Sequence, residues 1–138
     1  MGRVAAFDWG TKRIGVAVSD EERMLAHKAR VELKNDPSLY PGIQKFFREY
    51  QPEKILVGLP KSLSGELTES ALKALAFGKE LSRKFGIRVE FLDERFSTKT
   101  AQQKLKAGGK NFKQSRGDID NTVAQSMLQQ YLDRGKIP

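Results

Sequence analysis

One apolar run limits the fold of this chain more than any other feature. It reads Ile55-Leu56-Val57-Gly58-Leu59, between Lys54 and Pro60, with no polar interruption. A strand that is apolar at every position is buried on both faces, which is typical of strands inside a parallel sheet that helices cover. We therefore expect residues 54–60 to lie in the middle of an α/β sheet.

Strand and helix patterns alternate along the rest of the chain. Strands are expected at residues 4–7 and 14–18, joined by a turn-rich hairpin connection, at 24–33 and at 87–92. Helices are expected from Ser38 to the break at Pro52, over 69–85 up to Gly86, over 98–106 and over 120–132, with a loop at 108–117. The apolar residues that define three of these helical faces are Leu39, Ile43, Phe46 and Phe47; Leu72, Leu75, Ala76 and Leu81; and Val123, Ala124, Met127, Leu128 and Tyr131. This order predicts an α/β fold with a mixed five-stranded sheet flanked by helices, in a single domain over residues 1–138.

Charge and composition narrow the function. The 138 residues carry a net charge of +8. This favours acidic partners, and nucleic acid before a membrane, because no basic amphipathic segment accompanies the charge. The absence of cysteine argues against a disulfide scaffold or a cysteine-ligated zinc site. With no signal-peptide pattern and no apolar run of about 18 residues, a cytoplasmic location is expected.

Acidic residues stand where a strand pattern ends or a helix pattern begins. Asp8 follows the first strand, Asp93 and Glu94 follow the last strand, and Asp120 opens the final helix. Element ends are where a fold gathers distant residues into one pocket. Clustered carboxylates repel one another unless a cation joins them, and hard oxygen ligands suit Mg²⁺ or Mn²⁺. In a basic chain, this pattern indicates a metal-dependent nuclease that acts on phosphodiesters.

A run of basic residues precedes the last acid. Between Arg95 and Gly117 the sequence holds no acid. Gly108-Gly109 gives this segment freedom and Phe112 can stack on a base, so we interpret it as a phosphate clamp that orders on the substrate, with a solvated loop as the alternative. The candidate nucleic-acid contacts are Lys104, Lys106, Lys110, Lys113 and Arg116, together with Lys12 and Arg13 beside Asp8.

Three other residues are interpreted as structural. Trp9 is expected to pack beside the end of the sheet rather than to stack on a substrate. His27, the only histidine, lacks the partners for a catalytic triad or a zinc site. Asp20 is assigned to a turn, where Asp is common.

The turn Asp8-x-Gly10-Thr11 is of a kind shared by two groups of proteins. One group is the large phosphate-binding kinases and actin-like ATPases, and the other is the ribonuclease H-like nucleases. The ATPases need two such domains and this chain has room for one, which favours the nucleases.

Several motifs extend this similarity along nearly the whole chain, in one order. They are Asp8-x-Gly10-Thr11-Lys12-x-Ile14-Gly15-Val16-Ala17, Val57-Gly58-Leu59-Pro60 with Gly65, Asp93-Glu94-Arg95-x-Ser97-Thr98, and Ile119-Asp120 with Leu128-Gln129-x-Tyr131-Leu132. Together they resemble the YqgF/RuvX family, whose fold is ribonuclease H-like and related to Holliday-junction resolvases. In one departure, the family usually has a pair of alanines soon after the last acid, whereas this chain has Val123-Ala124-Gln125.

The resemblance implies roles for the acids. Asp8, Glu94 and Asp120 are expected to hold one or two Mg²⁺ or Mn²⁺ ions that activate a water and stabilise the leaving oxygen. Asp93 stays a second candidate within its pair. The alternative role for Asp93 is an ion pair with Arg95 or a lysine. The alternative for Asp120 is a helix N-cap, and Asp118 is a second candidate for its position.

The resemblance also implies the substrate, for which three hypotheses remain open. The first is a nuclease in 5′-end processing of precursor 16S rRNA, acting on structured RNA as a monomer or homodimer. The second is a dimeric Holliday junction resolvase that acts on branched DNA. The third is a non-catalytic RNA-binding factor in ribosome assembly that keeps the acids for metal and fold.

Overall fold

The computed structural model describes residues 2–59, 68–93 and 116–134, with side chains in the last range from Thr122 onward. Its strands are β1 (Val4–Asp8), β2 (Arg13–Ser19), β3 (Ala26–Lys28), β4 (Leu33–Lys34), β5 (Lys54–Leu59) and β6 (Arg88–Asp93). They form one mixed sheet in the order β3-β2-β1-β5-β6, and the short β4 also pairs with β2. The main path therefore has the five strands that were expected, and β4 is a sixth.

The strand expected at residues 54–60 is β5, and it lies inside the sheet, as predicted. β5 runs parallel to β1 on one side and parallel to β6 on the other. Ile55, Leu56 and Val57 are fully buried. The uninterrupted apolar run is explained by contact with a helical layer on each face of the sheet.

The N-terminal hairpin is confirmed, and the third strand differs from expectation. β1 and β2 pair antiparallel, from Ala5 opposite Val18 to Asp8 opposite Gly15. The single strand expected at 24–33 is wrong, because it divides into β3 and β4, which pair with different parts of β2. The expected start also lies outside β3, in a turn where the Asp20 carboxylate accepts hydrogen bonds from the backbone N–H groups of Met24 and Leu25.

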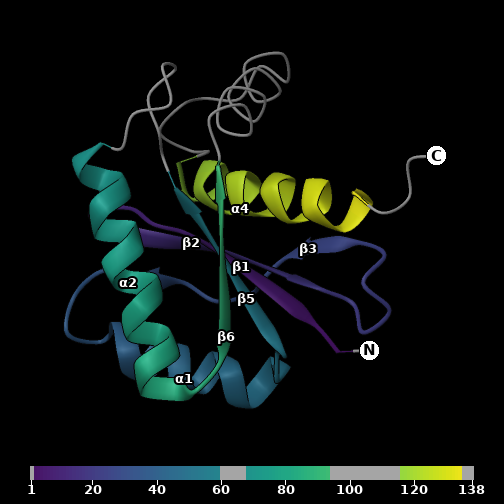
Figure 1. Cartoon of the computed structure of the whole chain (residues 1–138), viewed down its shortest axis with the longest axis horizontal. Helices are drawn as coiled ribbons and strands as arrows, with labels where there is room; N and C mark the ends of the chain where they lie inside the picture. Colours follow the sequence, from purple (N-terminus) through teal and green to yellow (C-terminus); the bar gives the residue numbers. More distant parts are fainter. Residues whose placement is uncertain (1, 60–67, 94–115, 135–138) are drawn as a thin grey trace.

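Three described helices cover the two faces of the sheet, and Figure 1 shows the sheet between them. They are α1 (Leu39–Tyr50), α2 (Glu69–Phe85) and α4 (Arg116–Asp133). Alternate residues of β1 serve the two faces: Ala5 and Phe7 pack with α1 and α2, whereas Val4 and Ala6 pack with α4. The mixed sheet flanked by helices is thus confirmed, while the helix expected at 98–106 lies outside the described residues.

The buried face of α2 was predicted in part. Leu81 is buried and Leu75 packs against the core, as expected, whereas Leu72 is 56% exposed and Ala76 is exposed. The other buried residues of the helix are Ala71, Ala74, Phe77 and Gly78. Gly78 faces β6 so closely that a Cβ there would lie 2.5 Å from the Phe91 ring. The bounds of α2 are as expected, since the Thr68 hydroxyl caps its start and Gly86, at φ 63°, ends it.

The last helix begins earlier than expected. α4 starts at Arg116 rather than at Asp120, so Arg116 and Gly117 belong to a helix and not to the predicted loop. Its predicted apolar stripe is confirmed, because Ala124, Met127 and Leu128 are buried against the sheet and Tyr131 packs beside them. The last helix is therefore in the expected register on the sheet.

Candidate functional site

Two of the predicted acids lie at one edge of the sheet. Asp8 is the last residue of β1 and Asp93 is the last residue of β6. Both strands run parallel to β5, which lies between them. Their carboxyl ends therefore meet at the same edge, two strand spacings apart, or about 10 Å.

Asp8 lies on the face that α4 covers. Side chains along a strand point to alternate faces, so Asp8 is on the same face as Val4 and Ala6, both of which pack with α4. Its partner across the hairpin is Gly15. On the other side, Phe7 pairs with Val57, so the next residue along β5 is Gly58. Asp8 is partly exposed, and the residues that lie directly beside it in the register of the two neighbouring strands are Gly15 and Gly58.

Asp93 belongs to the opposite face. It is paired with Leu59, which packs in the cluster under α1 and α2, and it is exposed. Leu92 packs on the α4 side instead. Strand alternation therefore separates Asp93 from Asp8, which the sequence alone did not do. Glu94 lies outside the described residues.

Asp120 is the fifth residue of α4. The alternative that makes it an N-cap is therefore wrong, since an N-cap residue precedes the first helical turn. The side chain of Asp120 lies outside the described residues. Among the described side chains, no three His, Cys, Asp or Glu residues gather into a group that could hold a metal ion.

Directional polar contacts fix α4 on the sheet. Gln129 Oε1 accepts a hydrogen bond from the Ala26 backbone N–H at 2.8 Å, and its amide donates to the Met24 carbonyl at 3.1 Å. Gln125 Nε2 donates to the Ala26 carbonyl at 3.0 Å. Gln125, which is part of the departure from the family pattern, therefore binds the backbone of the edge strand β3.

A second polar contact holds the carboxyl half of α4. Lys54 Nζ lies 2.6 Å from Glu90 Oε2 and donates to the Tyr131 hydroxyl. The hydrogen bond from Lys54 lowers the pKa of Glu90. Burial by itself would lower the pKa of Lys54, but its hydrogen bonds with Glu90 and Tyr131 raise it overall. These three groups join β5, β6 and α4 at the sheet end farthest from Asp8.

The turn after Asp8 is held in place by Asn35, a residue that sequence reasoning missed. Its side chain donates to the Gly10 carbonyl at 2.8 Å, and its backbone N–H donates to the Lys12 carbonyl at 2.8 Å. A Cβ on Gly10 would lie 2.4 Å from the Arg13 carbonyl oxygen, so the turn requires glycine. Lys12 is exposed on this turn and Arg13 begins β2.

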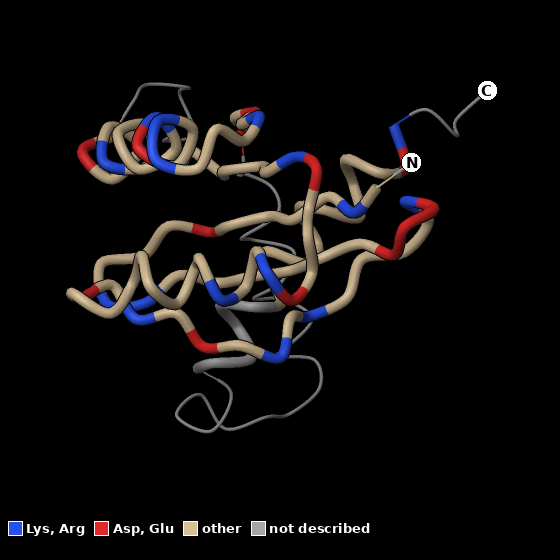
Figure 2. Tube along the Cα trace, turned by 90° about the horizontal axis from the view of Figure 1, so that it is seen from below, with Lys and Arg blue, Asp and Glu red and all other residues tan. Residues whose placement is uncertain are grey.

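The basic charge is concentrated outside the described residues. Figure 2 shows Lys and Arg interspersed with Asp and Glu over the described helices and turns. Residues 94–115 hold six Lys or Arg against one Glu, which is +5 of the net +8 of the chain. The predicted contacts Lys104, Lys106, Lys110 and Lys113 fall in that segment, and Arg116 is the first residue of α4.

The three residues interpreted as structural have different surroundings. Trp9 packs on Phe77, with ring centroids 5.2 Å apart, as expected. Asp20 caps its turn, and the hydrogen bond from the Leu25 backbone N–H lowers the pKa of this carboxyl. His27 is exposed on the edge strand β3.

Across the described part of the chain, no helix is long and apolar enough to span a membrane.

Relatives of known name match almost the whole chain. A protein of Dechloromonas aromatica is 36% identical over 134 residues, which cover 96% of this chain and 92% of the relative. A protein of Streptomyces avermitilis is 37% identical over 138 residues, which cover 99% of this chain and 88% of the relative. Both carry the name "Putative pre-16S rRNA nuclease".

Solved structures confirm the fold. The RuvC protein of T. thermophilus, solved in complex with a Holliday junction substrate, superposes with a TM-score of 0.60 at 16% identity. The match covers 99% of this chain and 96% of RuvC. A second structure of RuvC from Thermus thermophilus gives a TM-score of 0.57, also at 16% identity, over 97% of this chain and 96% of that one. The predicted ribonuclease H-like arrangement is therefore correct.

The family match agrees with these relatives. Residues 2–134 match the family described as "RuvX: Holliday junction resolvase". This description and the names of the relatives share one enzyme class, a hydrolase that cuts phosphodiester bonds. The predicted resemblance and the predicted nuclease class are both confirmed at the level of the family. The chain belongs to the RuvX family.

Proposed function

We propose that this chain is a metal-dependent nuclease of the cytoplasm that cuts structured RNA in 5′-end processing of precursor 16S rRNA. Asp8, Glu94 and Asp120 bind one or two Mg²⁺ or Mn²⁺ ions, within a single nuclease domain over residues 1–138. The names of the relatives support the RNA substrate. The basic segment supports binding to a phosphate backbone.

The placement of Asp8 carries the proposal. Its carboxylate ends a central strand on the face that α4 covers. Gly15 lies opposite it in the hairpin, and Gly58 follows in the register on the other side. A carboxylate with glycines on both neighbouring strands has space for a hydrated cation and for further oxygen ligands.

The direction of α4 brings Asp120 toward the same edge. Tyr131 contacts Lys54, which pairs with Val4 at the start of β1. The helix from Tyr131 back to Asp120 spans about 16 Å, and β1 from Val4 to Asp8 spans about 13 Å. The two lengths are similar, which supports our proposal that Asp120 lies at the level of Asp8.

The strand faces favour Glu94 over Asp93. Leu92 packs on the α4 side, and Asp93 follows it on the other side. The α4 side is the one that Asp8 shares. Because Asp93 lies on the opposite face, we include Glu94, the next acid in the sequence, in the proposed ligand set instead.

The residues present fit divalent metal ions. Carboxylate oxygens are hard ligands, which Mg²⁺ and Mn²⁺ prefer. Bound ions of this kind lower the pKa of a water and stabilise a leaving oxygen. In the proposed site, this chain supplies three carboxylates for the ions and orients the phosphate. Exposed Lys12, on the turn that Asn35 holds, is one described cation near Asp8 that can do so.

Neutralising one acid tests the metal site. Asp8→Asn and Asp120→Asn should keep or raise the melting temperature without metal, because each relieves repulsion among the acids. Wild type should gain stability on adding Mg²⁺ or Mn²⁺, by about 2.7 kcal/mol at 100 times the dissociation constant. Both variants should lose most of that gain and most cleavage. Glu49→Gln, an exposed acid on α1, is the control and should behave as wild type.

The substrate is tested with three probes. Wild type and both variants are incubated with Mn²⁺ and an rRNA precursor, a single-stranded RNA or a four-way DNA junction. Cleavage of the RNA supports the proposal. Paired symmetric nicks in the junction would instead support a resolvase. Tight RNA binding without cleavage would support a non-catalytic assembly factor.

The basic segment is tested by its salt dependence. Replacing Lys110, Lys113 and Arg116 together by Ala should weaken binding to unrelated sequences alike. The slope of log affinity against log salt should flatten by about 0.7–0.9 for each phosphate that the variant no longer neutralises. An unchanged affinity and slope would show that the segment is merely solvated.

A further inference from the structure

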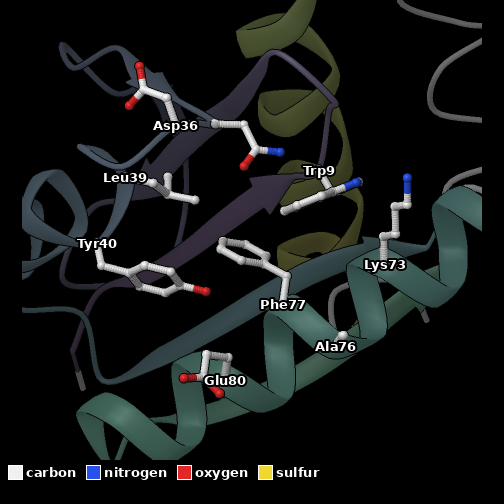
Figure 3. Close-up of a pocket in the computed structure, with 9 residues that line it drawn as sticks. Trp9, Asp36, Leu39, Tyr40, Lys73, Ala76, Phe77 and Glu80 are labelled. Atoms are coloured by element: carbon white, nitrogen blue, oxygen red, sulfur yellow. The ribbon is translucent and has the colours of Figure 1, made fainter.

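A pocket lies next to Asp8, on the opposite face of the sheet. Its volume is about 530 Å³, within the range of roughly 300–1,000 Å³ for small-molecule sites. Figure 3 shows that its walls come from the turn after β1, from α1 and from α2. The lining residues are Trp9, Asn35, Asp36, Leu39, Tyr40, Lys73, Ala76, Phe77 and Glu80.

The floor of this pocket, which we call the Trp9 pocket, is aromatic and apolar. Phe77 and Leu39 are almost fully buried there. Trp9 packs on Phe77 at an interplanar angle of 45°, and the Tyr40 ring forms another wall. Flat aromatic walls of this kind favour a planar ligand that can stack on them.

One polar group in the pocket lacks a partner. The indole Nε1 of Trp9 is buried and has no hydrogen-bond acceptor among the described residues. A buried donor without an acceptor costs about 1–3 kcal/mol. Because this nitrogen has almost no accessible surface, a ligand that supplies an acceptor recovers this cost by shifting the Trp9 ring. Figure 3 shows the Trp9 ring nitrogen and the Lys73 ammonium group toward one end of the pocket. That end favours a ligand oxygen or a negative charge.

The other charged groups of the pocket are already engaged. Asp36 accepts hydrogen bonds from the backbone N–H and hydroxyl of Ser38, and Glu80 is bonded to Arg83. Lys73 pairs with the exposed Glu69 at 3.6 Å, which is a weak contact that a ligand can replace. Trp9 and Lys73 are therefore the groups that select the ligand.

The position of the pocket indicates where the ligand comes from. Trp9 directly follows Asp8 in the chain, so their Cα atoms are about 3.8 Å apart. Asp8 lies on the face that α4 covers, whereas Trp9 packs with the cluster under α1 and α2. A nucleic-acid strand that crosses this sheet edge can place a phosphate at Asp8 and a neighbouring base in the pocket.

We propose that the Trp9 pocket binds one unpaired nucleobase of the substrate strand beside the scissile phosphate. The base stacks on the partly exposed Trp9 and Tyr40 rings, one of its acceptor atoms takes the indole N–H as the Trp9 ring shifts, and Lys73 lies near its phosphate. This inference rests on the proposed function and refines it. It selects substrates with unpaired nucleotides next to the cut, because a base inside a duplex cannot enter a side-chain pocket.

The fluorescence of Trp9 tests the proposal directly, since Trp9 is the only tryptophan in the chain. The full chain in EDTA is titrated with a single-stranded RNA hexamer, with the same hexamer made abasic at each position in turn, and with its blunt duplex. The hexamer should quench Trp9, and removal of one particular base should abolish the quenching. A saturating hexamer that leaves the fluorescence unchanged, or a duplex that quenches equally, would overturn the proposal.

Substitutions give a second test, with binding measured by anisotropy of a labelled hexamer. Trp9→Phe keeps a ring on Phe77 but removes the N–H, and should weaken hexamer binding about two- to tenfold while duplex binding stays the same. Lys73→Met should weaken hexamer binding more than Lys79→Met, which makes the same charge change at an exposed site on the same helix. Equal losses from the two lysine variants would overturn the role of Lys73. Melting curves show that each variant is folded.

Cleavage separates this inference from the function it rests on. If wild type cuts RNA with Mn²⁺, and Trp9→Phe cuts single-stranded and duplex RNA at wild-type rates, the nuclease stands and the pocket is wrong. If base-dependent quenching occurs but no substrate is cut, the pocket stands and the nuclease is wrong.

Discussion

The two faces of the sheet are built in different ways. Under α1 and α2, large aromatic side chains interlock: Phe7 packs on Phe46 and Phe77 at centroid distances of 5.8 and 6.0 Å. Under α4, the sheet presents small residues such as Ala6 and Ala17 to the helix. Polar contacts from Gln125 and Gln129 to the backbone around β3 then hold α4 in place.

This difference matches the tasks of the two faces. Aromatic packing contributes stability mainly through the apolar area that it buries. Small residues let a helix approach closely, and hydrogen bonds to backbone groups fix its position along the strands. The face that carries Asp8 is therefore organised by the position of one helix, α4. The stability of the other face comes from the volume of its buried aromatic side chains.

The largest expected effect is on the aromatic face. Phe46 is fully buried, so Phe46→Ala should reduce the free energy of unfolding by about 3–5 kcal/mol. A domain of ordinary stability, about 5–15 kcal/mol, would lose a large part of it. Urea unfolding measures the loss. Metal affinity per folded molecule should stay the same, and a lower affinity would show that the two faces are not independent.

Placing a larger side chain in the core under each helix distinguishes the two faces of the sheet more sharply. Ala124 on α4 and Ala74 on α2 are both fully buried. Replacing either by Leu should cost about 1–3 kcal/mol. Ala124→Leu should also reduce metal affinity per folded molecule, because it displaces the helix that carries Asp120, and Ala74→Leu should not. Equal metal affinity of the two folded variants would refute the link between α4 placement and the proposed metal site.

The glutamine contacts give a smaller effect. Gln129→Met keeps the length of the side chain but leaves the Ala26 N–H and the Met24 carbonyl without this partner. The free energy of unfolding should fall by about 1–2 kcal/mol. Gln44→Met, the same change at an exposed position of α1, should alter it by less than about 0.5 kcal/mol. Thermal unfolding of the two variants measures the difference.

The smallest effect depends on pH. The pKa of Glu90 is lowered by its hydrogen bond from Lys54, so the stability that its carboxylate contributes is present above the ordinary value of 4.5 and is lost as pH falls through the lowered pKa. The side chain is 39% exposed, which limits the contribution to about 1 kcal/mol or less. The stability difference between wild type and Glu90→Gln should be constant near neutral pH and shrink below pH 4.5. A difference that grows in acid would contradict this assignment.

The sequence predicted the architecture better than the faces of individual elements. The strand at 54–60 and the hairpin after Val4 follow from runs of apolar residues, which depend on local pattern. The buried stripe of α2 was misassigned in part because Gly78 is buried against Phe91, a contact that no spacing of large residues reveals. The separation of Asp93 from Asp8 required the pairing of β5 with β6, and the Trp9 pocket required α1 and α2 to meet.

The attachment of α4 has a consequence for the order of folding. Gln129 bonds to Ala26 across 103 positions of sequence, so this contact forms only after most of the chain has been synthesised. The β1–β2 hairpin, in contrast, joins neighbouring segments and can form early. Until α4 docks, Ala6 and Leu56 remain uncovered and Asp120 is absent from the proposed metal site. The nascent chain should therefore be inactive until its last described helix has left the ribosome.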